Sequence, residues 1–261
     1  MSEPRVLVTN DDGIDAPGIR ALVDALERIA DVTVVAPAEN QSWAGRDMTW
    51  HAGPTGIQEH DLGYAVEGTP ADAVTVALTV LDVEPDAVVS GVNDGMNLSA
   101  HILERSGTVG AAIEAAHFGV PAVAVSTADH RDPEPPHDDP AAFTLAAAAG
   151  AFVLDRALAA DAFAHADYLN VNAPAFAASP AVHLTRPDPE YAPELQRVDD
   201  ETGAVELRDG GWRRFLDGDP GHPETDRHAV LHGNVSVTPM RLPTRVDAGL
   251  DLDGFDPDDW Y

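Results

Sequence analysis

The chain has 261 residues, with 45 Asp and Glu against 15 cationic residues, and its formal net charge at pH 7 is −30. Every cationic residue is Arg, and Cys is absent, so the composition excludes disulfides, thiolate nucleophiles and Cys-ligated zinc. No basic stripe could neutralise a row of phosphates, which argues against a nucleic-acid polymer as the main partner and leaves small phosphorylated molecules open. Apolar residues make up 44% of the chain, which is enough for a packed core.

The acidic composition predicts a protein adapted to a salt-rich cell interior. A compact chain of this length has a radius of gyration of about 18 Å. So many like charges on its surface repel one another unless salt screens them strongly. The first ten residues do not form a charged leader followed by an apolar stretch, and we find no run of about 18 apolar residues. We therefore expect a cytoplasmic protein that does not act at a membrane.

The first half of the chain alternates short apolar runs with helical stretches, which is typical of an α/β protein with a mainly parallel sheet. A helix is predicted over residues 18–30, where apolar residues recur at the spacing of one buried face. A second is predicted over 69–81, with Thr69 as its cap. The other predicted elements here are strands at 6–9, 32–36, 87–90 and 122–126, a helix at 108–118, and a loop with a projecting hairpin within 38–64.

The second half begins with a proline-rich acidic stretch at 130–140, which we expect to be an exposed loop. An alanine-rich helix over 141–160 and a strand over 168–171 follow. Strand-like runs at 181–185, 204–207 and 234–239 indicate an antiparallel or extended region. We expect a catalytic core over 1–180, a C-terminal extension of the same domain over 181–243, and an acidic tail over 244–261.

Acidic and amide side chains follow the first predicted strand, in the order Asn10, Asp11, Asp12, Gly13. Ligands of open α/β sheets bind beyond the carboxyl ends of the strands, so this turn is well placed for a site. Two adjacent carboxylates repel each other, and a divalent cation relieves that repulsion. Taken by itself, however, the turn is more simply an ordinary acidic turn.

Two other strand ends carry oxygen-bearing side chains, and this favours a shared site. Ser42 follows the second strand, and Asn93 and Asn97 follow the strand at 87–90. Carboxylate, hydroxyl and amide oxygens suit magnesium, manganese or calcium better than zinc. The helix that begins near Ser106-Gly107-Thr108 offers free backbone N–H groups to an anion such as phosphate, although simple N-capping explains the same residues equally well.

Five ordered segments resemble the SurE family of nucleotidases. They are VTNDDGIDAPGIRAL (8–22), VVAPAENQSWAG (34–45), VEGTPADAV (66–74), VVSGVNDGMNL (88–98) and SGTVGAAIEAAHFGVPAVAVS (106–126). Weaker similarity continues through YLNVNAP (168–174), Thr225-Asp226 and GNVSVTP (233–239). The resemblance therefore extends to about residue 243.

The resemblance implies a metal-dependent phosphomonoesterase that hydrolyses nucleoside 5′- and 3′-monophosphates. It implies a Rossmann-like core and a C-terminal extension used in oligomerisation, so we expect a homodimer or homotetramer. The implied ligands of one divalent metal ion per subunit, Mg or Mn, are Asp11, Asp12, Ser42 and Asn93. The implied phosphate-binding positions are Asn97, Ser106, Gly107 and Thr108, with Asn10 nearby.

Three positions depart from the family pattern without removing an implied ligand. Trp43 stands where Gly is usual, Ser99 replaces a usual Gly, and Arg105 occupies a commonly aromatic position. Trp43 and Arg105 would reshape the mouth of the site, so these departures bear on substrate preference more than on the type of reaction.

The expected chemistry is in-line attack of a metal-polarised water on the phosphorus, with Asp11 or Asp12 as the catalytic proton acceptor. Direct attack by Asp11 through an aspartyl-phosphate ranks second. Two other functions stay open at this point: a phosphoryl hydrolase of other specificity, such as one that cleaves short polyphosphate, and a non-catalytic nucleotide-binding module. A serine hydrolase is disfavoured because no G-x-S-x-G motif occurs.

Overall fold

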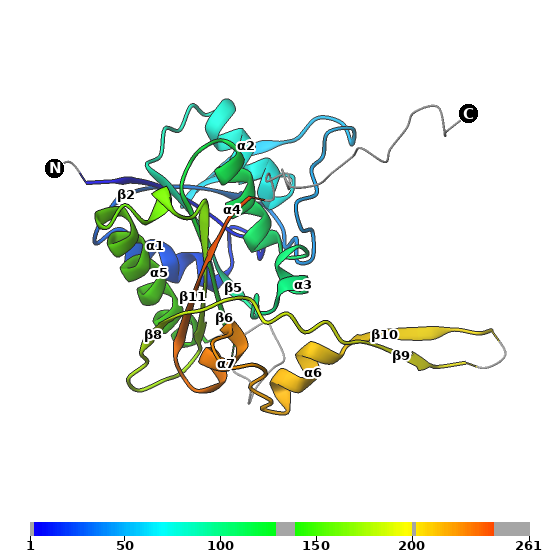
Figure 1. The fold of residues 1–261 in the computed structure, drawn as a ribbon. Coiled ribbons are helices and arrows are strands. Elements are labelled where there is room, and N and C mark those ends of the chain that lie inside the picture. The colour runs from blue at the N-terminus through cyan, green and yellow to red at the C-terminus, as the bar shows by residue number, and fades with distance from the viewer. Residues whose placement is uncertain (1–2, 129–138, 200–201, 243–261) are drawn as a thin grey trace, which may run out of the picture.

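The computed structural model describes residues 3–128, 139–199 and 202–242. Its centre is a nine-stranded mixed sheet with the strand order β3-β4-β2-β1-β5-β6-β7-β11-β8 (Figure 1). The inner strands are β2 (Asp31–Pro37), β1 (Arg5–Thr9), β5 (Ala87–Asp94), β6 (Ala122–Ala128) and β7 (Tyr168–Pro174). These five strands are parallel. The predicted α/β class with a mainly parallel sheet is therefore confirmed.

Helices cover both faces of the sheet. One face carries α1 (Pro17–Leu26) and α5 (Ala141–Ala159), and the other carries α2 (Pro70–Thr79) and α4 (Gly107–His117) (Figure 1). β1 shows why both faces are buried, because Val6 and Val8 pack into the α1 and α5 side while Leu7 packs into the α2 and α4 side. A strand that is buried on both faces in this way has an uninterrupted run of apolar residues in the sequence.

The helices of the first half form where the sequence predicts them, with different ends. α2 begins with a reciprocal capping box in which the Thr69 side chain accepts from the backbone N–H of Asp72 and the Asp72 carboxylate accepts from that of Thr69. α1 ends at Leu26, earlier than the predicted Ala30, after one buried face of Ile19, Leu22, Val23 and Leu26. Residues 27–30 form a turn into β2, and in this turn Ala30 is still buried.

The hairpin predicted within residues 38–64 exists, but the prediction that it projects from the sheet is wrong. Its strands are β3 (Ile57–His60) and β4 (Gly63–Val66), which pair with each other. β4 also pairs in parallel with β2, so the hairpin forms the edge of the main sheet. Burial of Ala65 and Val66 explains this, because Val66 packs into the core on the α2 and α4 face of the sheet and Ala65 packs into the core on the α1 and α5 face.

A different hairpin projects from the body. β9 (Pro193–Arg197) and β10 (Val205–Asp209) form a separate antiparallel pair that extends away from the rest of the molecule (Figure 1). The other elements after α4 are η1 (Ala162–Ala164), β8 (Val182–Leu184), α6 (Gly210–Leu216), α7 (Asp226–Leu231) and β11 (Val235–Met240). β11 pairs antiparallel with β7, so part of the extension belongs to the main sheet.

Among the described residues, α5 is long and apolar enough to span a membrane by length and composition alone, with a mean hydropathy of 1.5. More than half of it is buried, and it packs on α1, β6 and β7. It therefore has the burial expected of a core helix. The loop predicted at 130–140 lies almost entirely outside the described residues, as does the tail predicted at 244–261.

Candidate active site

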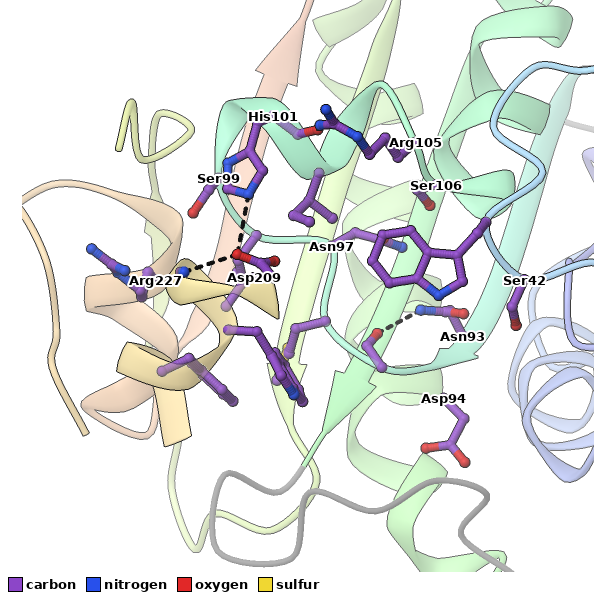
Figure 2. A pocket seen from close by; sticks show the side chains of 18 of the residues that line it. Ser42, Asn93, Asp94, Asn97, Ser99, His101, Arg105, Ser106, Asp209 and Arg227 are labelled. Atoms are coloured by element: carbon purple, nitrogen blue, oxygen red, sulfur yellow. Dashed lines mark hydrogen bonds and ion pairs between the residues drawn. The ribbon is translucent and has the colours of Figure 1, made fainter. Parts of the chain in front are cut away.

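A cavity of about 300 Å³ opens at the carboxyl ends of the central strands. Five of the predicted site residues line it, namely Asp11, Ser42, Asn93, Asn97 and Ser106. Ser42 and Asn93 lie toward one end of the cavity, whereas His101 and Asp209 lie toward the other (Figure 2). The structure therefore brings together side chains from β5, from the loops after β1 and β2, and from the start of α4, as the sequence predicts.

Asp11 lies between β1 and the N-terminus of α4. Its Oδ1 accepts a hydrogen bond of 2.7 Å from the Thr108 hydroxyl. A Cβ atom added to Gly107 would lie 2.7 Å from the Cβ of Asp11, so this position has no room for a side chain. The backbone N–H groups of Gly107 and Thr108 also favour the ionised form of Asp11. The anion that meets the start of α4 in this structure is therefore the Asp11 carboxylate itself.

The two carboxylates of the turn are electrostatically strained. Burial raises the pKa of Asp11, against the lowering effect of the Thr108 hydroxyl. Burial and then the neighbouring Asp11 charge raise the pKa of Asp12 to about 7. In the described part of the chain, no Arg or His forms an ion pair with either carboxylate.

Asp12 does not line the cavity, and it contacts the end of β5. Its Oδ2 accepts a hydrogen bond of 2.9 Å from the backbone N–H of Asp94. β5 extends four residues beyond the predicted strand, through a register shift between Ser90 and Asn93. This irregularity places Asn93 and Asp94 in the strand beside β6, and Asn93 Nδ2 donates to the Gly95 carbonyl at 2.6 Å.

The loop after β2 is tied to the turn after β1. The backbone N–H of Gln41 donates to the Asp11 carbonyl at 2.6 Å, and the N–H of Ser42 donates to Asn40 Oδ1 at 2.8 Å. Further along the loop, Arg46 pairs with Glu114 of α4 at 3.1 Å. Residues 41–46 of this loop are thus held at both ends, which places Ser42 at the cavity.

Asn97 is the centre of a buried hydrogen-bond network. Its Nδ2 donates to Ser126 Oγ at 2.8 Å and to Thr108 Oγ1 at 3.3 Å. Its backbone N–H donates to Asn172 Oδ1, and its carbonyl accepts from the side chains of Asn170 and Asn172. The two asparagines of β7 fix the loop after β5, and their signal in the sequence was the Tyr168–Pro174 similarity.

The remaining predicted phosphate positions have contacts within the protein. Ser106 lines the cavity, and its hydroxyl caps α4 by accepting from the N–H of Val109 at 3.1 Å. Asn10 is buried and does not line the cavity, and its Nδ2 donates to the Gly13 carbonyl at 2.8 Å. Its Oδ1 is buried without a hydrogen-bond partner.

The chemistry of this donor set fits a hard divalent cation. A buried and a partly buried carboxylate, both of raised pKa, lie in the turn after β1. The Ser42 hydroxyl after β2 and the Asn93 amide oxygen in β5 complete a set of oxygen ligands of the kind that Mg²⁺ and Mn²⁺ prefer. The unpartnered Oδ1 of Asn10 adds another acceptor oxygen near the same turn. No group of three His, Cys, Asp or Glu residues suited to a metal occurs in the described ranges, so an ion here depends on mixed oxygen ligands.

The far end of the cavity is built from residues that the sequence did not single out. α6 contributes Trp212 and Phe215, the loop after β5 contributes Met96 and Leu98, and Asp209 stands at the N-cap of α6. Met96, Leu98 and Phe215 pack in one small apolar cluster. α6 has only 7 residues, which is too short for helical periodicity to reveal it.

Asp226 joins the extension to the loop after β5. It accepts 2.9 Å hydrogen bonds from the backbone N–H groups of Ser99 and Asp188 and a 2.7 Å bond from that of Arg227. The Arg227 side chain is buried with Asp188 and reaches Glu190 at 2.8 Å. The hydrogen bond from Ser99 explains why Thr225-Asp226 resembles the SurE family, since through it Asp226 holds a cavity-lining loop in place.

The fold and cavity define an α/β protein whose oxygen-rich site lies at the carboxyl edge of a mainly parallel sheet. The family model of Survival protein SurE matches residues 6–192. 5′-nucleotidase SurE of Natronomonas pharaonis is 47% identical over 91% of this chain and 93% of its own length. That of Halobacterium salinarum is 48% identical over 97% of this chain and 96% of its own length.

A solved structure agrees with these sequence matches. The crystal structure of SurE from Aquifex aeolicus superposes with a TM-score of 0.76 at 32% identity, covering 93% of this chain and 95% of that one. The chain belongs to the SurE family.

Proposed function

We propose that this protein is a divalent-metal-dependent phosphomonoesterase that hydrolyses nucleoside 5′- and 3′-monophosphates to nucleoside and phosphate. The observation that carries the proposal is the single cavity lined by Asp11, Ser42, Asn93, Asn97 and Ser106. The 5′-nucleotidase names of relatives that are nearly half identical over almost the whole chain support the 5′-activity. The 3′-activity rests on the motif resemblance.

We assign the metal ligands to Asp11, Asp12, Ser42 and Asn93. When bound, a Mg²⁺ or Mn²⁺ ion would neutralise phosphate charge and make water more acidic. The protein contributes the arrangement of the ligands: Thr108 orients Asp11, the N–H of Asp94 orients Asp12, and the hydrogen bond from Gln41 ties the Ser42 loop to the Asp11 turn. These contacts order the oxygens before any ligand arrives.

Asp11 is the better placed of the two carboxylates to accept a proton, because it lines the cavity and Asp12 does not. In the proposed step, the oxygen of a water molecule bonds to phosphorus while its proton passes to the Asp11 carboxylate. The bond between phosphorus and the ester oxygen breaks, and that oxygen takes up the proton which Asp11 accepted, so the nucleoside leaves as an alcohol and the carboxylate is restored. Attack by Asp11 itself stays the second mechanism.

Phosphate oxygens are proposed to meet Asn97, Ser106, Gly107 and Thr108. Asn97 is fixed by Ser126 and β7, and Ser106 opens α4, so this wall is rigid. The Ser106 hydroxyl only accepts a bond from Val109, so its proton is left to donate to a phosphate oxygen and to stabilise charge that grows there. The amide hydrogens of Asn97 and the hydroxyl of Thr108 already donate within the protein, so they would exchange partners when phosphate binds. For Asn10 the contact with Gly13 favours a role in holding the turn.

We also propose that the protein acts as a dimer or tetramer assembled through the extension. Leu195 and Leu207 are paired in the β9–β10 hairpin and are 71% and 77% exposed. A lone two-stranded hairpin is marginally stable in water, and a second copy would cover this apolar face. Light scattering in molar salt tests this, and a monomer at micromolar protein concentration contradicts it.

The proposed activity is tested by phosphate release from 5′-AMP and 3′-AMP in molar salt, with Mg²⁺, Mn²⁺ or a chelator. Release that depends on the added metal supports the proposal. Short polyphosphate is included as a competing substrate, and faster release from it would assign a different specificity. Binding of AMP without release from any substrate would leave only a nucleotide-binding module. The cytoplasmic location also remains a proposal, and cell fractionation tests it.

A further inference from the structure

Trp43 has an unusual backbone and an unusual exposure. It lies in the left-handed region at φ 69°, where non-glycine residues are uncommon, and its side chain is 69% exposed. A bulky residue in this region is strained, and such strain concentrates at functional sites. Packing inside the protein does not explain the residue, because most of the indole has no protein neighbour.

The turn that carries Trp43 is firmly anchored. The N–H of Ala44 donates to the Gln41 carbonyl at 3.0 Å, and that of Asp47 donates to the Ala44 carbonyl at 3.0 Å. The carbonyl of Gly45 lies 2.1 Å from the place where a Cβ of Gly110 would stand, so the turn is pressed against α4. Trp43 is therefore held at the cavity by a fixed backbone.

Trp43 is positioned to contact the organic part of a substrate. It lines the cavity directly after Ser42, at the end where we place the phosphate. Beyond that end the lining is mainly apolar, with Met96, Leu98, Ile102, Trp212 and Phe215. A phosphomonoester with its phosphate beside Ser42 would thus extend its leaving group along a wall that includes the exposed indole.

We infer that Trp43 stacks on the base of the nucleotide and gives this enzyme a preference for nucleotides with a large base. The inference rests on the proposed function and specifies which leaving group the site favours. Aromatic stacking on a base contributes about 1–3 kcal/mol when measured by alanine substitution, which corresponds to roughly 5- to 150-fold in affinity. The larger ring of a purine gives more stacking area than that of a pyrimidine.

The test compares Trp43→Gly, Trp43→Phe and the control Trp50→Gly on 5′-AMP, 5′-CMP and ribose 5-phosphate. Glycine suits the positive φ of position 43, so this variant keeps the turn. Trp50 is a matched control because it is 73% exposed in the same loop and does not line the cavity. Trp43→Gly should lower kcat/KM for 5′-AMP about 5- to 100-fold, lower that for 5′-CMP less, and leave that for ribose 5-phosphate within twofold.

Trp43→Phe should retain most of the activity on 5′-AMP, and Trp50→Gly should match the unchanged protein. Equal losses on 5′-AMP and ribose 5-phosphate would overturn the inference, because they indicate a structural role for Trp43 or a role in contact with a second copy. An unchanged kcat/KM for 5′-AMP would overturn it as well.

A binding measurement separates this inference from the proposed hydrolysis. If the unchanged protein releases no phosphate from any substrate, the proposed function fails, and the role of Trp43 is then decided by fluorescence. Addition of 5′-AMP should quench indole emission in the unchanged protein and much less in Trp43→Phe, while ribose 5-phosphate should leave both unaffected. Equal quenching in the two proteins would exclude stacking on Trp43.

Discussion

The turn after β1 and the C-terminal extension build opposite ends of one cavity in opposite ways. At the first end, Asp11 is 3% exposed and held by α4. At the other end, a hairpin with largely exposed side chains leads directly into α6, which lines the cavity. The Asp11 end of the cavity is therefore formed by buried elements of the main sheet, whereas the surroundings of the other end depend on how the extension is covered.

Asp11→Asn is expected to have the largest effect on the activity. The change keeps the size of the side chain but removes its charge and its ability to accept a proton. Phosphate release should fall at least about a hundredfold, the scale of lost general-base catalysis, while the melting temperature is retained. Hydrolysis of 5′-AMP and 3′-AMP with Mn²⁺ in molar salt measures this.

Asp15→Asn is the control for that variant. Asp15 is exposed in the same acidic turn and pairs with Arg20 at 3.0 Å and with His60 at 3.3 Å. Its replacement should leave the rate almost unchanged. If both variants lose activity equally, the overall charge of the turn matters and the position of one carboxylate does not.

Gly107→Ala tests the close contact between α4 and Asp11. The added methyl would lie 2.7 Å from the Cβ of Asp11 and 2.8 Å from its Oδ2, so the carboxylate must move. We expect kcat to fall about tenfold or more, since small misplacements of a reacting group are costly. Gly56→Ala is the control, because the added methyl there meets only the end of the exposed Glu67 side chain. Equal rates in the two variants would contradict the tight placement of Asp11.

Changes in the β9–β10 hairpin should alter the assembly and leave the rate of phosphate release almost unchanged. Leu195→Glu combined with Leu207→Glu places charges on the apolar face, so light scattering in molar salt should show a smaller assembly. The turnover number on ribose 5-phosphate should stay within about threefold of the original, because the reacting end is unchanged. Gln196→Glu, on the opposite face of the hairpin, should keep the assembly. Loss of assembly in this control would show that added charge alone disrupts it.

A smaller effect is expected from Asp226→Asn as the pH changes. Burial raises the pKa of Asp226 to about 6 from its usual value near 3.8. The folded state then binds more protons than the unfolded state between about pH 4 and 6, so the contribution of this group to stability is full below that range and lost as pH rises through 6. Asparagine does not ionise. As the pH rises from 4.5 to 7.5, the difference in melting temperature between the variant and the original protein should therefore shift by roughly 5 °C in favour of the variant. A relative change of the opposite sign would contradict the raised pKa.

Salt is expected to act on the whole acidic surface. Lowering the ionic strength from molar to tenth-molar lengthens the screening distance from about 3 Å to about 10 Å. Because the net charge is −30, repulsion between surface carboxylates should lower the melting temperature by several degrees when the ionic strength is reduced in this way. A melting temperature that does not change would contradict adaptation to high salt. The matches to proteins of halophilic archaea agree with that adaptation.

The sequence predicts the regions whose side chains are buried. Apolar runs predict β1 and β2, and helical spacing together with the Thr69 cap predicts α2. These local signals agree with the overall fold. The convergence of Asp11, Ser42 and Asn93 follows from the rule that parallel strands end at one edge of a sheet. These predictions depend only on local patterns and on general topology.

The elements that were missed lack such patterns. β9 has mostly exposed residues, α6 is short, and α7 has only 6 residues, so none of them carries a long buried period. The contacts of Asp226 with Ser99 and Asp188 join residues 127 and 38 positions away, and no local rule reports such distances. The hydrogen-bond network around Asn97 could not be predicted from local sequence patterns either, because it depends on side chains from β6 and β7.

The separation of Asp11 from α6 along the chain has a consequence for how this enzyme could be altered. The groups that we propose to bind the phosphate come from the first 108 residues, whereas α6 lines the cavity with residues 210–216. Replacing α6 and Trp43 together, with Asp11, Thr108 and Asn97 untouched, is therefore a direct route to enzymes that release phosphate from sugar phosphates or other alcohol phosphates. Recombination of α6 segments among relatives would change only that wall of the cavity, whereas Trp43 adjoins Ser42 in the sequence and has to be changed by point substitution.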